Sequence, residues 1–142
     1  MKCWILAALI LVLFYGNPFQ KYDTEKLLPI RCVQAYRQGS QIHIFSEAGE
    51  GYGSSWEEAV EDLRNKASGE VFFDTAEQAV FSDPLLAMEA AMSGDLRPAA
   101  EVFFRKEAED PETLHAYLSQ HGSKLKIADI TKGRKERESN RE

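Results

Sequence analysis

Hydrophobic and polar residues alternate in two runs of the chain, and the turn residues Gln38–Ser40 separate these runs. Alternation on both sides of a short polar turn is typical of a β-hairpin with one covered face. We therefore predict a hairpin with strands at about 29–36 and 41–47.

Three later segments carry hydrophobic residues at the spacing of an amphipathic helix, and each opens on a helix-start signal. Ser55 followed by Glu58 is a capping box, in which each side chain accepts a hydrogen bond from a backbone N–H at the helix start. Asp83 and Asp110 each precede a proline, which is favoured at the first helical position. We predict three helices that start after these caps and end near Gly69, Gly94 and Gly122.

Short apolar runs between the helices predict further strands at 71–74, 78–81 and 100–105, and residues 75–78 fit a helical turn equally well. The predicted order mixes a hairpin, single strands and helices, which indicates an α+β fold. We expect a single two-layer domain over residues 28–130, in which the hairpin and the short strands pack on about three helices.

The first 19 residues differ from the rest, because the apolar run Cys3–Tyr15 follows a lysine at position 2. This layout predicts one N-terminal apolar helix that acts as a signal anchor or a signal peptide. Bulky aromatic residues stand where a cleavage site requires small ones, so an uncleaved anchor in the cytoplasmic membrane is favoured. The domain then lies on the extracytoplasmic side, behind a polar tether at residues 20–27, and it is secreted if the signal is cleaved.

Charge is distributed unevenly along the chain. The whole sequence carries a net charge of −6, residues 20–130 carry 11 Lys and Arg against 20 Asp and Glu, and the last twelve residues are net positive. An acidic body argues against nucleic acid as a partner, because binding to phosphates requires a clustered basic surface. Residues 131–142 contain almost no apolar side chain, and we predict a disordered charged tail there.

The glycine-rich segment GEGYG at residues 49–53 raises the question of a phosphate-binding loop. A P-loop requires a lysine after its last glycine, and a dinucleotide fingerprint requires G-x-G-x-x-G; the segment matches neither pattern. Nearby glutamates would also repel an anion. We interpret the segment as a backbone bend ahead of a capped helix, and Gly51 and Gly53 as candidate points of close approach by the backbone of another chain.

The other reactive side chains form no catalytic pattern in the sequence. His115 and His121 are six residues apart and fall on different faces of a helix, and no Cys or His pair has zinc-ligand spacing. Paired carboxylates are ordinarily solvated in so acidic a chain. Of the two cysteines, Cys3 lies in the apolar run and Cys32 is expected to be a small buried hydrophobic residue. We predict that the protein is not an enzyme and has no catalytic residue, cofactor or metal site.

The chain contains three segments in the order found in the N-terminal domain of the Ger(x)C spore-germination proteins, the C subunit of germinant receptors: GEGYGSSWEEAVEDL, GEVFFDTAEQAVFS and DLRPAAEVFF. From about Leu28 to Leu118 it resembles a short, free-standing version of that domain. The positions that carry the resemblance are Gly49, Glu50, Gly51, Glu58, Ala59, Leu63, Phe72, Phe73, Arg97 and Pro98. The chain departs from the pattern of this family at two positions. Cys3 precedes the apolar run, so lipid attachment is not implied, and Asp74 stands where the family often has a histidine.

The resemblance implies a non-enzymatic domain that works beside membrane proteins of germination. We expect a membrane-anchored extracytoplasmic protein that acts by protein–protein interaction in spore germination or sporulation, with membrane germinant-receptor or sporulation proteins as partners. Gly51, Gly53 and Arg97 are the candidate interaction residues. Two alternatives stay open, namely a secreted or anchored hydrolase with a carboxylate site and a structural protein of the envelope.

Overall fold

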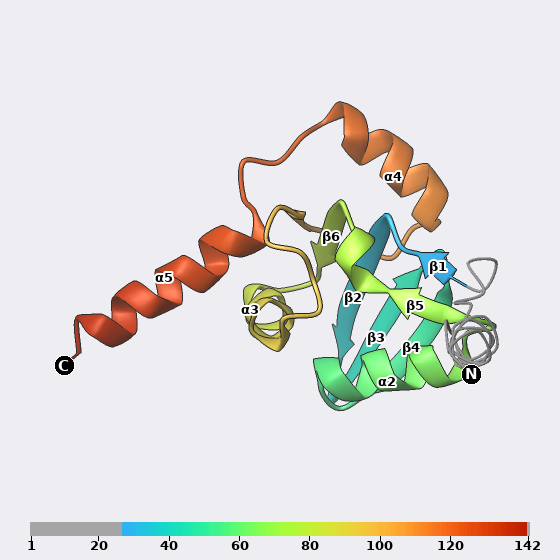
Figure 1. Ribbon diagram of the computed structural model, residues 1–142, viewed down its shortest axis with the longest axis horizontal. Helices are drawn as coiled ribbons and strands as arrows, with labels where there is room; N and C mark the ends of the chain where they lie inside the picture. Colours follow the sequence, from blue (N-terminus) through green and yellow to red (C-terminus); the bar gives the residue numbers. More distant parts are fainter. Residues whose placement is uncertain (1–26, 142) are drawn as a thin grey trace, which may run out of the picture.

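A five-stranded sheet lies at the centre of the computed structural model, which describes residues 27–141 (Figure 1). The strand order is β4-β3-β2-β6-β7, and β1 and β5 form a separate parallel pair. The strands are β1 (Leu27–Pro29), β2 (Cys32–Gln38), β3 (Gln41–Ser46), β4 (Gly49–Gly53), β5 (Glu70–Phe72), β6 (Gln78–Phe81) and β7 (Glu101–Phe104). The helices are α2 (Trp56–Lys66), the 3-10 helix η2 (Phe73–Thr75), α3 (Pro84–Ser93), α4 (Pro111–Gln120) and α5 (Ile127–Ser139). The predicted α+β class is confirmed.

The sheet is antiparallel on one side of β2 and parallel on the other. Strands β2 and β3 form the predicted hairpin, with Gln38 opposite Gln41 and Gly39 at a positive φ of 61° in the turn. Strand β4 continues the antiparallel side, whereas β6 and β7 run parallel to β2. Parallel neighbours require a crossover, and α3 provides it between β6 and β7.

Successive residues of β2 point to opposite faces of the sheet, and helices cover both faces unequally. Val33 belongs to the large core that includes residues of α2 and α3, with Trp56 and Phe81 among its fully buried side chains. The neighbouring Cys32 belongs to a smaller cluster that includes Leu114 of α4. The main hydrophobic core therefore lies on the α2 and α3 side, and α4 adds a smaller cluster on the other side.

The predicted helix caps are present in the structure. The Ser55 hydroxyl accepts a hydrogen bond from the Glu58 N–H at 3.2 Å, and the Glu58 carboxylate accepts one from the Ser54 N–H at 2.9 Å, one residue earlier than a standard capping box places it. Asp83 caps α3 and Asp110 caps α4 in the same way. These side chains satisfy amides that a helix start leaves without partners, which is why the three helices begin where the sequence predicts.

Several expectations for individual segments are wrong. The strand predicted at 71–74 ends at Phe72, because Phe73–Thr75 form the 3-10 helix η2. Residues 49–53 form the strand β4 rather than a bend, because all five residues pair with β3. The predicted disordered tail, residues 131–142, is helical through Ser139, because α5 starts earlier, at Ile127, which is buried against the core. The predicted tether, residues 20–27, ends inside β1, where Leu27 pairs with Glu70.

Both edges of the central sheet have backbone amides that are already bonded within the chain. On β4 the Tyr52 N–H donates to the Asp62 carboxylate of α2 at 2.9 Å, and on β7 the Val102 N–H donates to the Leu125 carbonyl at 2.8 Å. The Asp62 carboxylate is also 2.5 Å from the Lys66 ammonium, and these contacts hold the pKa of Asp62 below its usual value. Side chains and a connecting segment thus cover edge positions that would otherwise be open to another strand.

The predictions for residues 1–19 and for most of the tether lie outside the described residues. Within residues 27–141, none of the helices combines the length and the apolar character needed to cross a bilayer.

Candidate interaction surface

Helix α3 is apolar on nearly all sides, although only one side is buried. Leu86, Ala87, Ala90 and Ala91 face the core. On the outer side, Leu85 is 71% exposed, Met88 37% and Met92 45%, and Phe104 at the end of β7 is 47% exposed. We call Leu85, Met88, Met92 and Phe104 the α3 patch. A surface helix normally carries polar residues on its outer side, so exposed apolar groups gathered in this way indicate an interaction surface.

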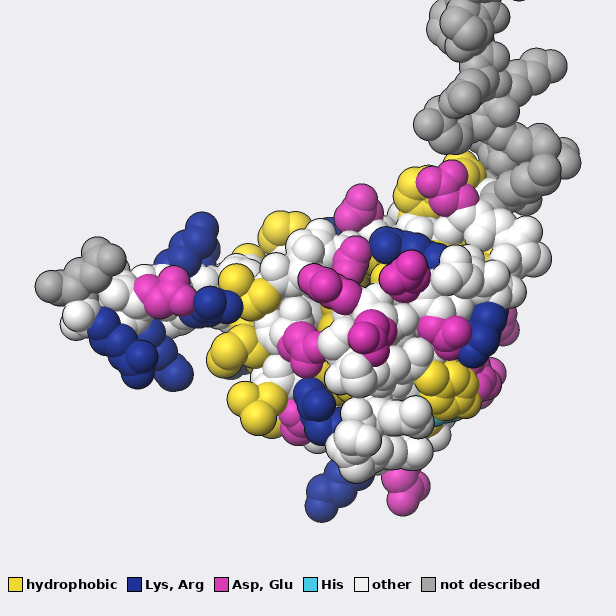
Figure 2. All heavy atoms as spheres, turned by 90° about the horizontal axis from the view of Figure 1, so that it is seen from below, with side chains coloured by type: hydrophobic (Ala, Val, Ile, Leu, Met, Phe, Trp, Pro, Cys, Tyr) yellow, Lys and Arg dark blue, Asp and Glu magenta, His cyan; other side chains and the backbone are white. Residues whose placement is uncertain are grey.

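A groove of about 560 Å³ runs between α3 and α5. Its apolar wall is formed by Pro84, Ala87, Met88 and Phe104, and its other wall by residues of α5. Figure 2 shows hydrophobic side chains gathered at the base of the arm that α5 forms, and basic side chains along the arm itself. A second hollow of about 380 Å³ shares Met88 and Arg134 with the groove and extends along α3 to Met92. The two hollows form one continuous surface along α3.

The α5 wall of the groove changes from apolar to basic along the helix. Ile127 is buried and Ile130 packs against the core, which fixes the first turn of α5. Farther along, Arg134, Arg137 and Arg141 line the groove. At about 100° per residue Arg134 and Arg137 lie within about 40° of the Ile130 direction, so they continue the face by which α5 is attached, and Arg141 follows in the turn after the helix.

The structure gives Gly51 and Gly53 a role inside the chain. A Cβ atom on Gly51 would lie 2.2 Å from the Ala59 carbonyl oxygen, and one on Gly53 would lie 2.5 Å from the Ala59 nitrogen. Helix α2 therefore packs directly on the backbone of β4. The close approach predicted from the glycines exists, but the approaching backbone is that of helix α2 rather than that of another chain.

Arg97 lies near the opposite edge of the sheet from these glycines. It lines a polar hollow of about 290 Å³ beside the starts of β6 and β7, which Glu77, Glu101 and Lys126 also line. The Arg97 Nε is buried and has no hydrogen-bond partner among residues 27–141. The three candidate interaction residues of the sequence analysis thus do not form one site, because β4 and β7 are opposite edges of the sheet.

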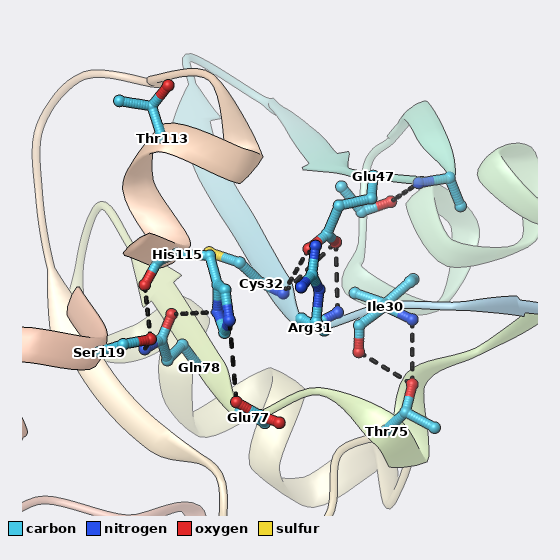
Figure 3. A network of polar contacts seen from close by, with 12 residues as sticks. Ile30, Arg31, Cys32, Glu47, Thr75, Glu77, Gln78, Thr113, His115 and Ser119 are labelled. Carbon is cyan, nitrogen blue, oxygen red and sulfur yellow. Dashed lines mark hydrogen bonds and ion pairs between the residues drawn. The ribbon is translucent and has the colours of Figure 1, made fainter. Parts of the chain in front are cut away.

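A polar network attaches α4 to the start of β6 (Figure 3). His115 Nδ1 is 2.9 Å from the side-chain oxygen of the buried Gln78, and His115 Nε2 is 3.9 Å from the Glu77 carboxylate. The Ser119 hydroxyl donates to the His115 carbonyl at 2.7 Å, so its proton is directed to the backbone and not to the imidazole. The arrangement lacks the serine-to-imidazole hydrogen bond of a nucleophile and its base, and it serves instead to position α4.

Cys32 is a buried thiol at the start of β2, as the sequence predicts. Burial, with the Glu47 carboxylate beside it, raises the pKa of this thiol to about 12. The thiolate is the nucleophilic form of cysteine, so Cys32 is unreactive at neutral pH in the folded protein.

We expect a disulfide reagent such as DTNB to leave Cys32 unmodified in the folded protein at pH 8, in a variant with Cys3→Ser. The same variant in denaturing urea should react fully, because unfolding exposes the thiol and returns its pKa to the ordinary range. Release of thionitrobenzoate, followed by absorbance, measures both rates. Equal rates in the folded and unfolded states would show that Cys32 is accessible.

Neither a metal-binding group within the described residues nor a similar protein is found. In residues 27–141 no group of three or more His, Cys, Asp or Glu side chains is placed to hold a metal ion. Comparison with protein-family models, with curated proteins and with solved structures gives no match. The resemblance to the Ger(x)C N-terminal domain therefore stays a prediction.

The α3 patch is not evident from the spacing of apolar residues. That spacing predicts a helix after Asp83, but it does not show which of Leu85, Met88 and Met92 the core can cover. The available signal was composition, because residues 84–93 contain one charged side chain, Glu89, and a helix that is apolar all round cannot bury every side in a small domain.

Proposed function

We propose that this protein is a membrane-anchored extracytoplasmic protein that acts by contact with another protein, in spore germination or sporulation. The observation that carries the proposal is the α3 patch beside the groove, because exposed apolar side chains of this kind are typical of protein–protein interfaces. The N-terminal apolar run supports the anchored topology. The resemblance to the Ger(x)C domain supports the biological setting.

Topology and interaction are tested separately in the organism that encodes the protein. A reporter that is active only outside the cytoplasm, fused to the C-terminus, should give a signal in the membrane fraction. A silent reporter would overturn the predicted topology.

The interaction is tested with a double variant of the patch. Leu85→Glu with Met92→Glu should reproduce the sporulation or germination defect of a deletion strain, because it places charges on exposed apolar positions without disturbing the core. The matched control is Gln41→Glu with Gln120→Glu, which introduces the same charge at exposed positions on β3 and α4. A wild-type phenotype for the patch variant, at normal protein level, would overturn the proposed function.

A further inference from the structure

The groove between α3 and α5 has two unlike walls, and together they define the chemistry of an occupant. We propose that it binds an amphipathic helix of a partner protein, with apolar side chains against the α3 patch and carboxylates against Arg137 and Arg141. This inference rests on the proposed function and names the kind of segment that the partner contributes.

The apolar wall fits the ridge of a helix. The groove is concave, holds about 560 Å³, and brings Met88 and Phe104 together from α3 and β7. Methionine side chains are flexible and polarisable, so they adapt to apolar residues of a docking helix. An amphipathic helix binds such a groove through side chains from successive turns of one of its faces.

The basic wall supplies the charge preference. Arg134 is paired with Glu138 at 2.7 Å, whereas Arg137 and Arg141 have no ion-pair partner among residues 27–141. A guanidinium can bind a carboxylate through two parallel hydrogen bonds. Two unpaired arginines that line the groove, Arg137 in the last turn of α5 and Arg141 just after the helix, therefore favour a docking helix with acidic residues at the end that reaches them.

The observations favour a protein helix over a lipid surface. A bilayer surface is broad and would meet the rim of a concave groove rather than its walls. Asp129 and Glu138 also line the groove, so its charge is mixed rather than uniformly basic, whereas binding to an anionic bilayer is favoured by a cluster of basic residues. A helix with carboxylates at one end can place them on the arginines and keep its other residues away from these acidic groups.

The probe is a short synthetic helical peptide that has leucines along one face and glutamates in one terminal turn. A matched peptide carries lysines in place of the glutamates. Binding of each labelled peptide to the full chain, kept in solution by a non-ionic detergent, is measured by fluorescence anisotropy. We expect the glutamate peptide to bind at least about tenfold more tightly than the lysine peptide, with an affinity that falls as salt is added.

Three variants test whether the peptides bind in the groove. Arg137→Glu with Arg141→Glu should reverse the preference, so that the lysine peptide binds more tightly. Lys132→Glu with Lys135→Glu makes the same change of net charge about 140° or more around α5 from Ile130, and it should leave the preference for the glutamate peptide intact. Met88→Glu should weaken the binding of both peptides. Circular dichroism checks that each variant keeps the helix content of the wild type.

Several results would overturn the inference. The first is equal affinity for the two peptides, or binding of neither, and the second is an equal effect of the two charge-reversal variants. Arginine-dependent binding to phosphatidylglycerol vesicles with no peptide preference would assign the surface to a membrane. A concentration-dependent dimer that is lost in Met88→Glu would assign it to a second copy of this chain. The first two results and a dimer leave contact with a protein to be judged by the patch variant in the cell, whereas a surface that binds only membrane would overturn the proposed function as well.

Discussion

Replacing Gly51 by alanine is expected to lower the free energy of unfolding by at least about 3 kcal/mol, and the double change Gly51→Ala, Gly53→Ala is expected to prevent folding. The reason is the contact between α2 and β4. A Cβ atom added at position 51 would lie 2.2 Å from the Ala59 carbonyl oxygen and 2.7 Å from the Leu63 Cβ, distances far inside van der Waals contact. Both neighbours belong to a helix that the buried Trp56 fixes on the core, so the helix cannot move away cheaply.

The measurement is urea unfolding of the full chain, followed by far-ultraviolet circular dichroism. The matched control is Gly133→Ala in α5, where an added Cβ has no atom within 4 Å. Alanine favours a helix over glycine by about 0.5–1 kcal/mol, so this variant should be as stable as the wild type or slightly more stable. A Gly51→Ala protein with an unchanged urea midpoint would refute the packing of α2 on the backbone of β4.

Replacing Trp56 by alanine is expected to lower the free energy of unfolding by about 3–5 kcal/mol. Trp56 is fully buried at the first turn of α2, and its ring lies 6.2 Å from that of Phe73 and 6.1 Å from that of Phe81. Its indole N–H donates to the Asp95 carboxylate at 3.0 Å, which joins α2 to the end of α3. Removing the ring leaves a cavity and also leaves Asp95 without that donor.

Far-ultraviolet circular dichroism again measures unfolding, because it does not depend on indole fluorescence. The control is Tyr117→Ala, since Tyr117 is 48% exposed on α4 and its loss should change the free energy of unfolding by no more than about 0.5 kcal/mol. If Trp56→Ala lowers the free energy of unfolding as little as Tyr117→Ala does, the assignment of Trp56 to the core is contradicted.

Local signals in the sequence predicted the helix starts and the hairpin, and failed where the decisive contacts are long-range. The caps at Ser55, Asp83 and Asp110 act within one turn, so they can be recognised without a structure. Strand β4 could not be recognised from the sequence, because glycine is unfavourable in strands. Its formation is explained by its pairing with β3 and its packing under α2. The helix α5 was missed for a similar reason: a buried Ile127 fixes its start, while its exposed turns show no apolar periodicity.

The candidate site was less predictable than the fold. Gly51, Gly53 and Arg97 were chosen from glycine spacing and from a resemblance, and the structure places them at opposite edges of the sheet. The α3 patch depends on which side of an apolar helix the core covers, and the groove depends on where α5 lies. Neither can be read from a hydrophobic pattern, because both follow from the packing of segments that are far apart in the sequence.

The hydrogen-bonded edges of the central sheet affect whether neighbouring copies of the protein can pair strand to strand. Strand-to-strand growth into fibrils begins when an open edge of one molecule accepts the backbone of the next. Here Asp62 holds the Tyr52 amide on one edge and Leu125 holds the Val102 amide on the other. A strand of another molecule must therefore displace the Tyr52 bond on β4 or the Val102 bond on β7 before it can pair in register along that edge, which makes the exposed side chains of the α3 patch the easier point of contact.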